Sequence, residues 1–161
     1  DQFELRRLAA PYFHSRLDGG EGDMLVGKAL WAYLHKKAHM ICELSPYACM
    51  PNTMSVGAMA GVLGKYPDIL YAPLEIKGDA EVHALSRCQM ILTEARKRAQ
   101  REFEETLAST GLTTIEVRGY LDAHPEMKRA TYRVPKGDAV GTAANLILHV
   151  AKLTGRRTSG R

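Results

Sequence analysis

The sequence has few cysteines and no long apolar run, and each absence excludes a class of protein. Three cysteines in 161 residues are too few, and odd in number, for the disulfide framework of a small secreted protein. Their spacing also lacks the paired cysteine elements of a structural zinc site. No apolar stretch approaches the roughly 20 residues of a membrane-spanning helix. We therefore expect a cytoplasmic protein with reduced thiols and no membrane partner.

Charge of one sign is not in large excess either. The 22 basic and 18 acidic residues give a net charge of +4, and no basic face is interleaved with aromatic residues. Nucleic-acid binding requires such a face, so we expect no nucleic-acid partner. In the last segment, residues 154–161, Arg156, Arg157 and Arg161 have no acidic neighbour in sequence. This segment is typical of a solvated, flexible basic tail.

The remaining composition is that of a globular protein with a substantial core, at 45% hydrophobic and 25% charged residues. A chain of this length fits one domain, which we place at residues 1–153. The first residues, DQFELRRLAA, contain neither an initiator methionine nor the apolar segment of a signal peptide. This start predicts the inner part of a longer polypeptide, of which the chain is a C-terminal fragment.

Helical periodicity of apolar residues recurs along most of the chain. Asp23, Asp79, Thr113 and Thr142 have the character of helix N-caps, Thr113 with Glu116 in the spacing of a capping box. Gly64 is typical of a helix end. The predicted helices cover residues 3–17 (broken near Pro11), 24–37, 53–63, 77–109, 114–124 and 143–153.

Short apolar segments between these helices predict strands at residues 40–45, 69–76 and 129–135. Pro73 makes the second strand irregular or peripheral. Alternating strands and helices favour a parallel sheet. We therefore expect an α/β protein: a Rossmann-like three-layer sandwich with a short, mostly parallel sheet flanked by helices, and extra C-terminal helices.

Cys49 is the cysteine whose position suggests more than packing. Cys42 lies in a predicted strand and Cys88 in the apolar seam of a helix, where free cysteine is a common core residue. Cys49 lies in ICELSPYACMPN, between a strand and the next helix. Loops at the carboxyl ends of parallel strands bind ligands, and a helix N-terminus stabilises a thiolate. Two roles remain open at this point: a functional thiolate or a small structural residue.

Other patterns fit structural as well as functional roles. His35 and His39 are four residues apart and could share a metal, but they also lie where a helix end favours positive charge. Residues 136–145 could present helix N–H groups to a phosphate, or form a plain loop and cap. Ser45 and Ser55 have no evident base beside them in sequence.

Three stretches together resemble a known family. GGEGDMLVGKAL, ICELSPYACMPN and LYAPLEIKGDAEVHALSRCQMILTEA are similar to the C-terminal part of the 2-hydroxyacyl-CoA dehydratase component family. The similarity is closer to the large activator-related proteins of acyl-CoA dehydratases and benzoyl-CoA reductases. It covers roughly residues 17–100, and its most specific element is Cys-Met-Pro at the end of a strand.

The resemblance implies a domain of an iron–sulfur protein in anaerobic, ATP-coupled electron transfer. It implies that Cys49 ligates a [4Fe–4S] or double-cubane cluster and that Glu21 and Arg87 belong to the cofactor site. A [4Fe–4S] cluster has about four thiolate ligands, so the others would come from other domains of the same polypeptide. A dehydratase or reductase component would be a further partner. The chain has no ATP phosphate-binding loop, and we expect no activity from it in isolation.

Two other functions remain open. The chain could be a non-catalytic docking module that lacks the cluster and binds an acyl-CoA or another phosphate-bearing ligand. Alternatively, Cys49 could be a covalent nucleophile, although no histidine is placed by the sequence as its base.

Overall fold

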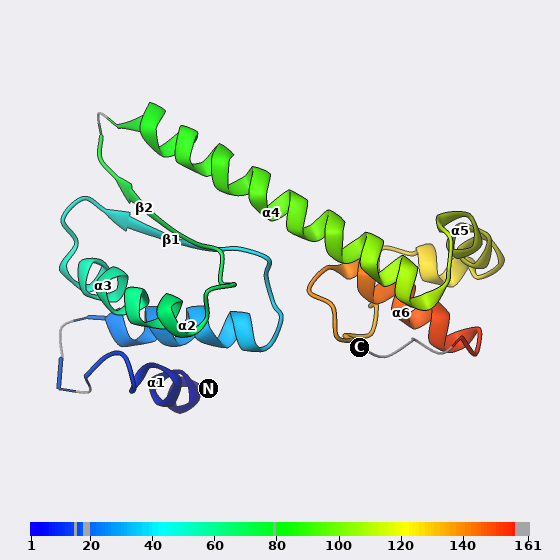
Figure 1. The fold of residues 1–161 in the computed structure, drawn as a ribbon, viewed down its shortest axis with the longest axis horizontal. Helices are drawn as coiled ribbons and strands as arrows, with labels where there is room; N and C mark the ends of the chain where they lie inside the picture. Colours follow the sequence, from blue (N-terminus) through cyan, green and yellow to red (C-terminus); the bar gives the residue numbers. More distant parts are fainter. Residues whose placement is uncertain (15, 18–19, 79, 157–161) are drawn as a thin grey trace. The chain divides into compact units, whose positions relative to one another are not determined.

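The computed structural model describes residues 1–161 except 15, 18–19, 79 and 157–161 (Figure 1). Its contacts divide the chain into two compact units, residues 1–95 and 96–161. Helix α4 (Glu81–Thr110) is continuous through this boundary. The region predicted as a single domain therefore comprises two compact units that share one helix.

The first unit contains a two-stranded parallel sheet flanked by helices (Figure 1). Ile41 lies opposite Tyr71 at one end of the ladder and Pro46 opposite Ile76 at the other. The sheet confirms the mixed α/β class and its parallel pairing. The elements of this unit are α1 (Gln2–Ala9), α2 (Gly22–Leu34), β1 (Ile41–Pro46), α3 (Met50–Lys65), β2 (Tyr71–Ile76) and the first turns of α4.

The second unit is helical in the part that is described. An apolar cluster of Leu112, Val117, Ile147, Val150 and Ala151 holds it together. Its elements after α4 are α5 (Thr114–Ala123), the 3-10 helix η1 (Pro125–Lys128) and α6 (Thr142–Leu153). None of the described helices combines the length and the apolar character needed to cross a membrane.

The third predicted strand, residues 129–135, is wrong. These residues form turns and irregular structure between η1 and α6. A strand needs a neighbour for its backbone hydrogen bonds, and the described part of the second unit contains none. The segment is instead attached through a side chain, since the Tyr132 hydroxyl and His149 Nε2 are hydrogen-bonded at 2.8 Å.

Three of the predicted helix ends are displaced. The N-cap of α2 is Glu21 rather than Asp23, and Asp23 instead pairs with Arg6 at 3.3 Å. The N-cap of α6 is Gly141 rather than Thr142. Helix α3 continues through Gly64 to Lys65.

The helix ends of the second unit carry one confirmation and one correction. The capping box of Thr113 and Glu116 is present. Arg156, expected to have no acidic neighbour, donates to Glu116 Oε1 at 2.5 Å and also to the Gly111 carbonyl. Hydrogen bonds from Thr113, and then Arg156, lower the pKa of Glu116. The chain after α6 therefore turns back onto the start of α5.

Two further predictions, the Asp79 cap and residues 157–161 of the basic tail, lie outside the described residues.

A close contact between α1 and α2 fixes the core of the first unit. A Cβ atom added to Gly27 would lie 2.3 Å from the Leu5 carbonyl oxygen, so only glycine allows this approach. Around the contact, buried side chains of α1, α2 and α3 form one cluster. Its members include Ala9, Val26, Ala29, Leu30, Met59 and Val62.

Gly27→Ala is expected to lower the free energy of unfolding by about 1–3 kcal/mol, because the added methyl group forces α1 away from α2. Gly57→Ala is the matched control, since a Cβ there meets no atom within 4 Å. In the interior of α3 it should stabilise the protein by about 0.5–1 kcal/mol. Urea unfolding of both variants measures the difference, and equal effects would show that Gly27 is not a packing requirement.

Candidate functional site at the carboxyl edge of the sheet

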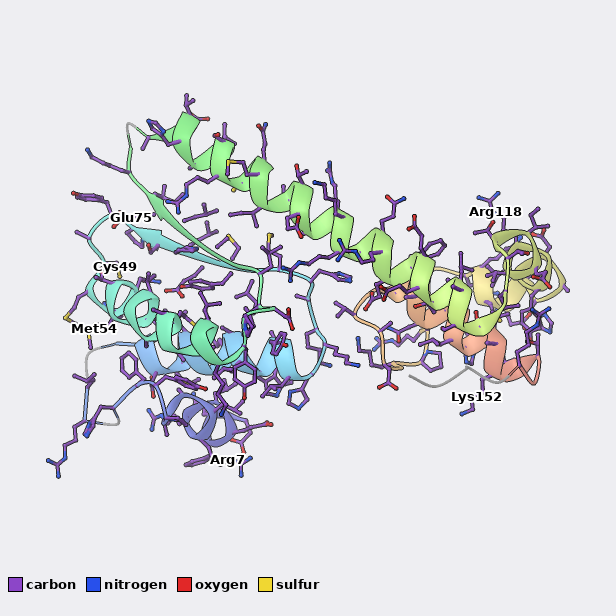
Figure 2. The ribbon with its side chains drawn as sticks, viewed as in Figure 1. Arg7, Cys49, Met54, Glu75, Arg118 and Lys152 are labelled. Carbon is purple, nitrogen blue, oxygen red and sulfur yellow. The ribbon has the colours of Figure 1, made fainter. Side chains whose placement is uncertain are left out.

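The end of β1 and the start of α3 present the Cys49 thiol at the edge of the sheet. Cys49 is the N-cap of α3, and its side chain makes no capping hydrogen bond. Its carbonyl accepts the N–H and the hydroxyl of Thr53, both at 2.9 Å. The residue is half-buried and in no disulfide. Figure 2 shows Cys49 and Glu75 at the same end of the sheet. The sulfur is therefore not enclosed in the core.

The turn before Cys49 is tied to β2. Ala48 has a positive φ of 56°, which is uncommon for a residue other than glycine and persists where surrounding contacts hold it. Its N–H donates to Glu75 Oε1 at 2.9 Å, and the N–H of Tyr47 donates to the Ile76 carbonyl at 3.0 Å. These bonds fix the backbone that carries Cys49 relative to both strands.

The glycine-glutamate-glycine element packs against the Cys-Met-Pro element. A Cβ on Gly20 would lie 2.5 Å from Pro51 Cγ, and one on Gly22 would lie 3.1 Å from the Pro51 carbonyl oxygen. Gly20 also has a φ of 93°, in the left-handed region that favours glycine. Glu21, between them, is exposed. Two motifs singled out in the sequence are thus brought together at the N-termini of α2 and α3.

A cavity of about 240 Å³ lies at the same edge and contains Arg87. Thr53 donates to Cys49, and Glu75 accepts from Ala48. Among the described residues, neither the Ser45 hydroxyl nor the Arg87 guanidinium has a bonded partner. Cys49 is not part of the lining. The lining residues are Ser45, Asn52, Thr53, Val56, Pro73, Glu75 and Arg87.

A buried carboxylate connects both strands to the start of α3. Glu43 on β1 is 7% exposed. Its Oε1 accepts Asn52 Nδ2 at 3.0 Å and the Ser55 hydroxyl, and its Oε2 accepts the Tyr71 hydroxyl at 2.6 Å. A buried charge is tolerated only when it is well hydrogen-bonded. Because Asn52 also lines the cavity, this network connects the cavity to both strands.

Sequence reasoning missed this network. The available signal was an acid in a strand of otherwise apolar character, but its partners Ser55 and Tyr71 lie 12 and 28 residues away. Ser55, for which no base was evident, contacts a carboxylate in the structure. It is 0% exposed, so its hydroxyl supports the fold and is not open to a substrate.

The other two cysteines are less buried than predicted. Cys42 is exposed and Cys88 is half-buried. The prediction of core packing for Cys42 is wrong. The described sheet has only two strands, so β1 is an edge strand and no further strand shields Cys42 on that edge. Neither residue lines the cavity.

The structure does not support two other candidate sites, a phosphate site at residues 136–145 and a metal site at His35 and His39. Glu102 accepts the N–H groups of Val140 at 2.6 Å and Gly141 at 2.8 Å, so a carboxylate of the protein itself takes the N–H groups considered for a phosphate. The described part of the chain contains no group of three or more His, Cys, Asp or Glu side chains that could hold a metal ion. His35 and His39 are therefore not part of such a group. Cys49 offers a single thiol.

Models of known protein families, curated proteins and solved structures were compared with this chain, and none matches it. The chemistry of the site therefore rests on its own groups. These groups are the half-buried Cys49 thiol at a helix N-terminus and the buried Glu43 carboxylate. Beside the cavity lie the Arg87 guanidinium and the Ser45 hydroxyl, which have no hydrogen-bond partner among the described residues.

The Tyr71–Glu43 bond predicts a specific pH dependence. Burial, and then the hydrogen bond to Glu43 and its charge, raise the pKa of Tyr71 above its ordinary value of 10.0. A raised pKa in the folded state means that the stabilisation is complete below the unfolded pKa and is lost as the pH rises above it. The free energy of unfolding should therefore fall more steeply above pH ~10 in the wild type than in Tyr71→Phe.

The measurement is urea unfolding from neutral to alkaline pH. At neutral pH Tyr71→Phe should be less stable by about 1 kcal/mol through the lost hydrogen bond, and the difference should shrink in alkali. Tyr47→Phe, at a 62% exposed tyrosine, should keep the wild-type slope. Parallel slopes for all three proteins would disprove the linkage.

Proposed function

We propose that this chain is the iron–sulfur-cluster-associated domain of an anaerobic, ATP-coupled electron-transfer activator or 2-hydroxyacyl-CoA dehydratase-like protein. Its sheet would be part of a Rossmann-like layered fold completed by other domains of the same polypeptide, in a cytoplasmic protein. One observation carries the proposal: the Cys49 thiol stands at the N-terminus of α3, with the glycine-glutamate-glycine element packed on the adjoining Pro51.

The position of Cys49 suits a thiolate ligand. Free N–H groups and the positive end of the helix dipole at the start of a helix stabilise the deprotonated sulfur. Helix α3 is 16 residues long, and the bonds of Ala48 and Thr53 hold its first turn in place. The thiol fits one terminal ligand position, and the remaining ligands would come from outside the described residues. When bound, a [4Fe–4S] or double-cubane cluster would accept and pass low-potential electrons.

Glu21 and Arg87 would lie around the cofactor. A thiolate-ligated cluster tends to be anionic, so the cationic Arg87 at the strand ends would stabilise it. The Glu21 side chain makes no capping hydrogen bond although the residue is the N-cap of α2. Its carboxylate is therefore available to a partner, such as a dehydratase or reductase component.

Cys49→Ser should lose most of the bound iron and acid-labile sulfide when the complete protein is reconstituted anaerobically, because the cluster loses a thiolate ligand. Cys42→Ser and Cys88→Ser are matched controls that remove a thiol elsewhere in the same unit, and both should keep the wild-type content. Iron and sulfide counts that are equal in all three variants would remove Cys49 from the cluster.

The cavity beside Cys49 favours a second function, a docking module that binds a phosphate-bearing ligand without metal. The side chains of Arg87 and Ser45 form no hydrogen bond with a described residue. Guanidinium groups recognise phosphate and carboxylate. At about 240 Å³ the cavity is smaller than the roughly 300–1,000 Å³ of a pocket that encloses a drug-sized ligand. It would therefore accept a phosphate-bearing part of an acyl-CoA rather than the whole molecule.

Arg87→Gln should weaken binding of acetyl-CoA to the metal-free chain by about tenfold or more, because a charge-assisted hydrogen bond contributes about 1.5–3 kcal/mol. Isothermal titration calorimetry measures the affinity. Arg101→Gln removes the same charge from α4 outside the cavity lining and should bind as the wild type does. Absence of binding to the wild type, or equal losses in both variants, would exclude this function.

A further inference from the structure

The second unit contains a cavity of about 370 Å³ beside α6. This volume falls within the roughly 300–1,000 Å³ of small-molecule sites. One face of α6 forms one wall, because the helical residues of the lining recur three or four positions apart. The loop before α6 forms the other wall. The described lining residues are Pro135, Lys136, Gly137, Asn145, Leu148, His149, Lys152 and Leu153.

Side-chain hydrogen bonds hold this loop in place. Asn145, which is 4% exposed, accepts the Gly137 N–H at 2.8 Å through Oδ1. Its Nδ2 donates to the carbonyls of Ala139 at 2.9 Å and Gly141 at 3.0 Å. The Lys136 ammonium also donates to the Ala139 carbonyl, at 2.6 Å. These two polar side chains are therefore bound to the backbone of the loop, and the wall is already formed without a ligand.

The rest of the wall is largely apolar. Leu153 is 51% exposed and Leu148 is half-buried, and Pro135 lies across from them on the loop. Covering such side chains removes apolar surface from water, which favours binding. The cavity therefore suits a ligand with an apolar body.

Two polar groups of the lining have no bond to a described residue. Lys152 is exposed and extends from α6 (Figure 2), and its ammonium has no hydrogen bond or ion pair with the described chain. His149 Nε2 is bonded to the Tyr132 hydroxyl, whereas Nδ1 has no described partner. When Nε2 accepts the Tyr132 hydroxyl proton, the neutral ring carries its own proton on Nδ1, which is then a donor. An ammonium and an N–H therefore remain for a ligand, in a described lining without acidic side chains.

We propose that this cavity is a binding site for a small monocarboxylate with an apolar body. The carboxylate pairs with Lys152 and accepts a hydrogen bond from His149 Nδ1, while the apolar body covers Leu148 and Leu153. The site lies wholly in the second unit, so it does not depend on the function proposed for the first unit.

The charges of the cavity favour a carboxylate over a phosphate group. Among the described lining residues, Lys152 is the one cation whose ammonium is not bound to the loop. A single ammonium matches the single charge of a carboxylate, whereas a phosphate group carries up to two charges and three acceptor oxygens. The N–H groups before α6 that could supply more donors are bound by Glu102.

Isothermal titration calorimetry of the full chain with octanoate and with octanamide tests the role of charge. The wild type should bind octanoate about tenfold more tightly than octanamide, because hydrogen bonds between charged groups are stronger than neutral ones. Lys152→Gln should lose this preference and keep the octanamide affinity, which shows that the variant is folded. Arg118→Gln removes a charge from an exposed residue of α5 outside the lining and should bind both compounds as the wild type does. A wild type that does not bind octanoate, or an unchanged preference in Lys152→Gln, would overturn the proposal.

A cavity-filling variant tests the location of the site. Leu153→Trp places a larger side chain in the lining at an exposed position, and should weaken the binding of both octanoate and octanamide. Ile115→Trp is the matched control, since Ile115 is 81% exposed on α5 and outside the lining, and it should keep both affinities. Equal affinities in the wild type and Leu153→Trp would place the ligand elsewhere and contradict this site.

Discussion

The buried Glu43 carboxylate is the interaction on which the candidate site depends. Removing a charge from water is unfavourable by several kcal/mol unless hydrogen bonds replace the lost hydration. Here the replacement comes from one side chain of β2 and two of α3. The sheet, the crossover helix and the start of that helix therefore cannot shift independently, because each donor left without its acceptor is unfavourable by about 1–3 kcal/mol.

That constraint determines how Cys49 is presented. Asn52 and Ser55 donate side-chain hydrogen bonds to Glu43, and the Ala48 N–H donates to Glu75. Cys49 lies between these two anchors, so its backbone is fixed while its side chain makes no capping bond. Gly20 and Gly22, at the start of α2, add a third constraint, since they let this segment lie directly on Pro51. The backbone that carries the thiol is therefore held by three separate sets of contacts.

Features that depend on local periodicity could be predicted from the sequence. The spacing of apolar residues identified β1, β2 and the helices around them, and the Thr113–Glu116 capping box is local by construction. Features that depend on distant partners could not. Residues 129–135 have the composition of a strand but no strand beside them in the described part of the chain, and Arg156 contacts Glu116, which lies 40 residues away in sequence. The burial of Cys42 depends on the number of strands, which no single segment encodes.

The candidate site divides in the same way. Cys49 could be singled out because it lies near the predicted end of a strand, whereas Arg87, within a predicted helix, was named only through the family resemblance. The Glu43 network required the register that brings Tyr71 beside β1. Pro73 has a related consequence for the behaviour of the protein in solution. Because proline donates no backbone hydrogen bond at the middle of the outer edge of β2, that edge is a poor template for the strand-by-strand addition from which fibres grow.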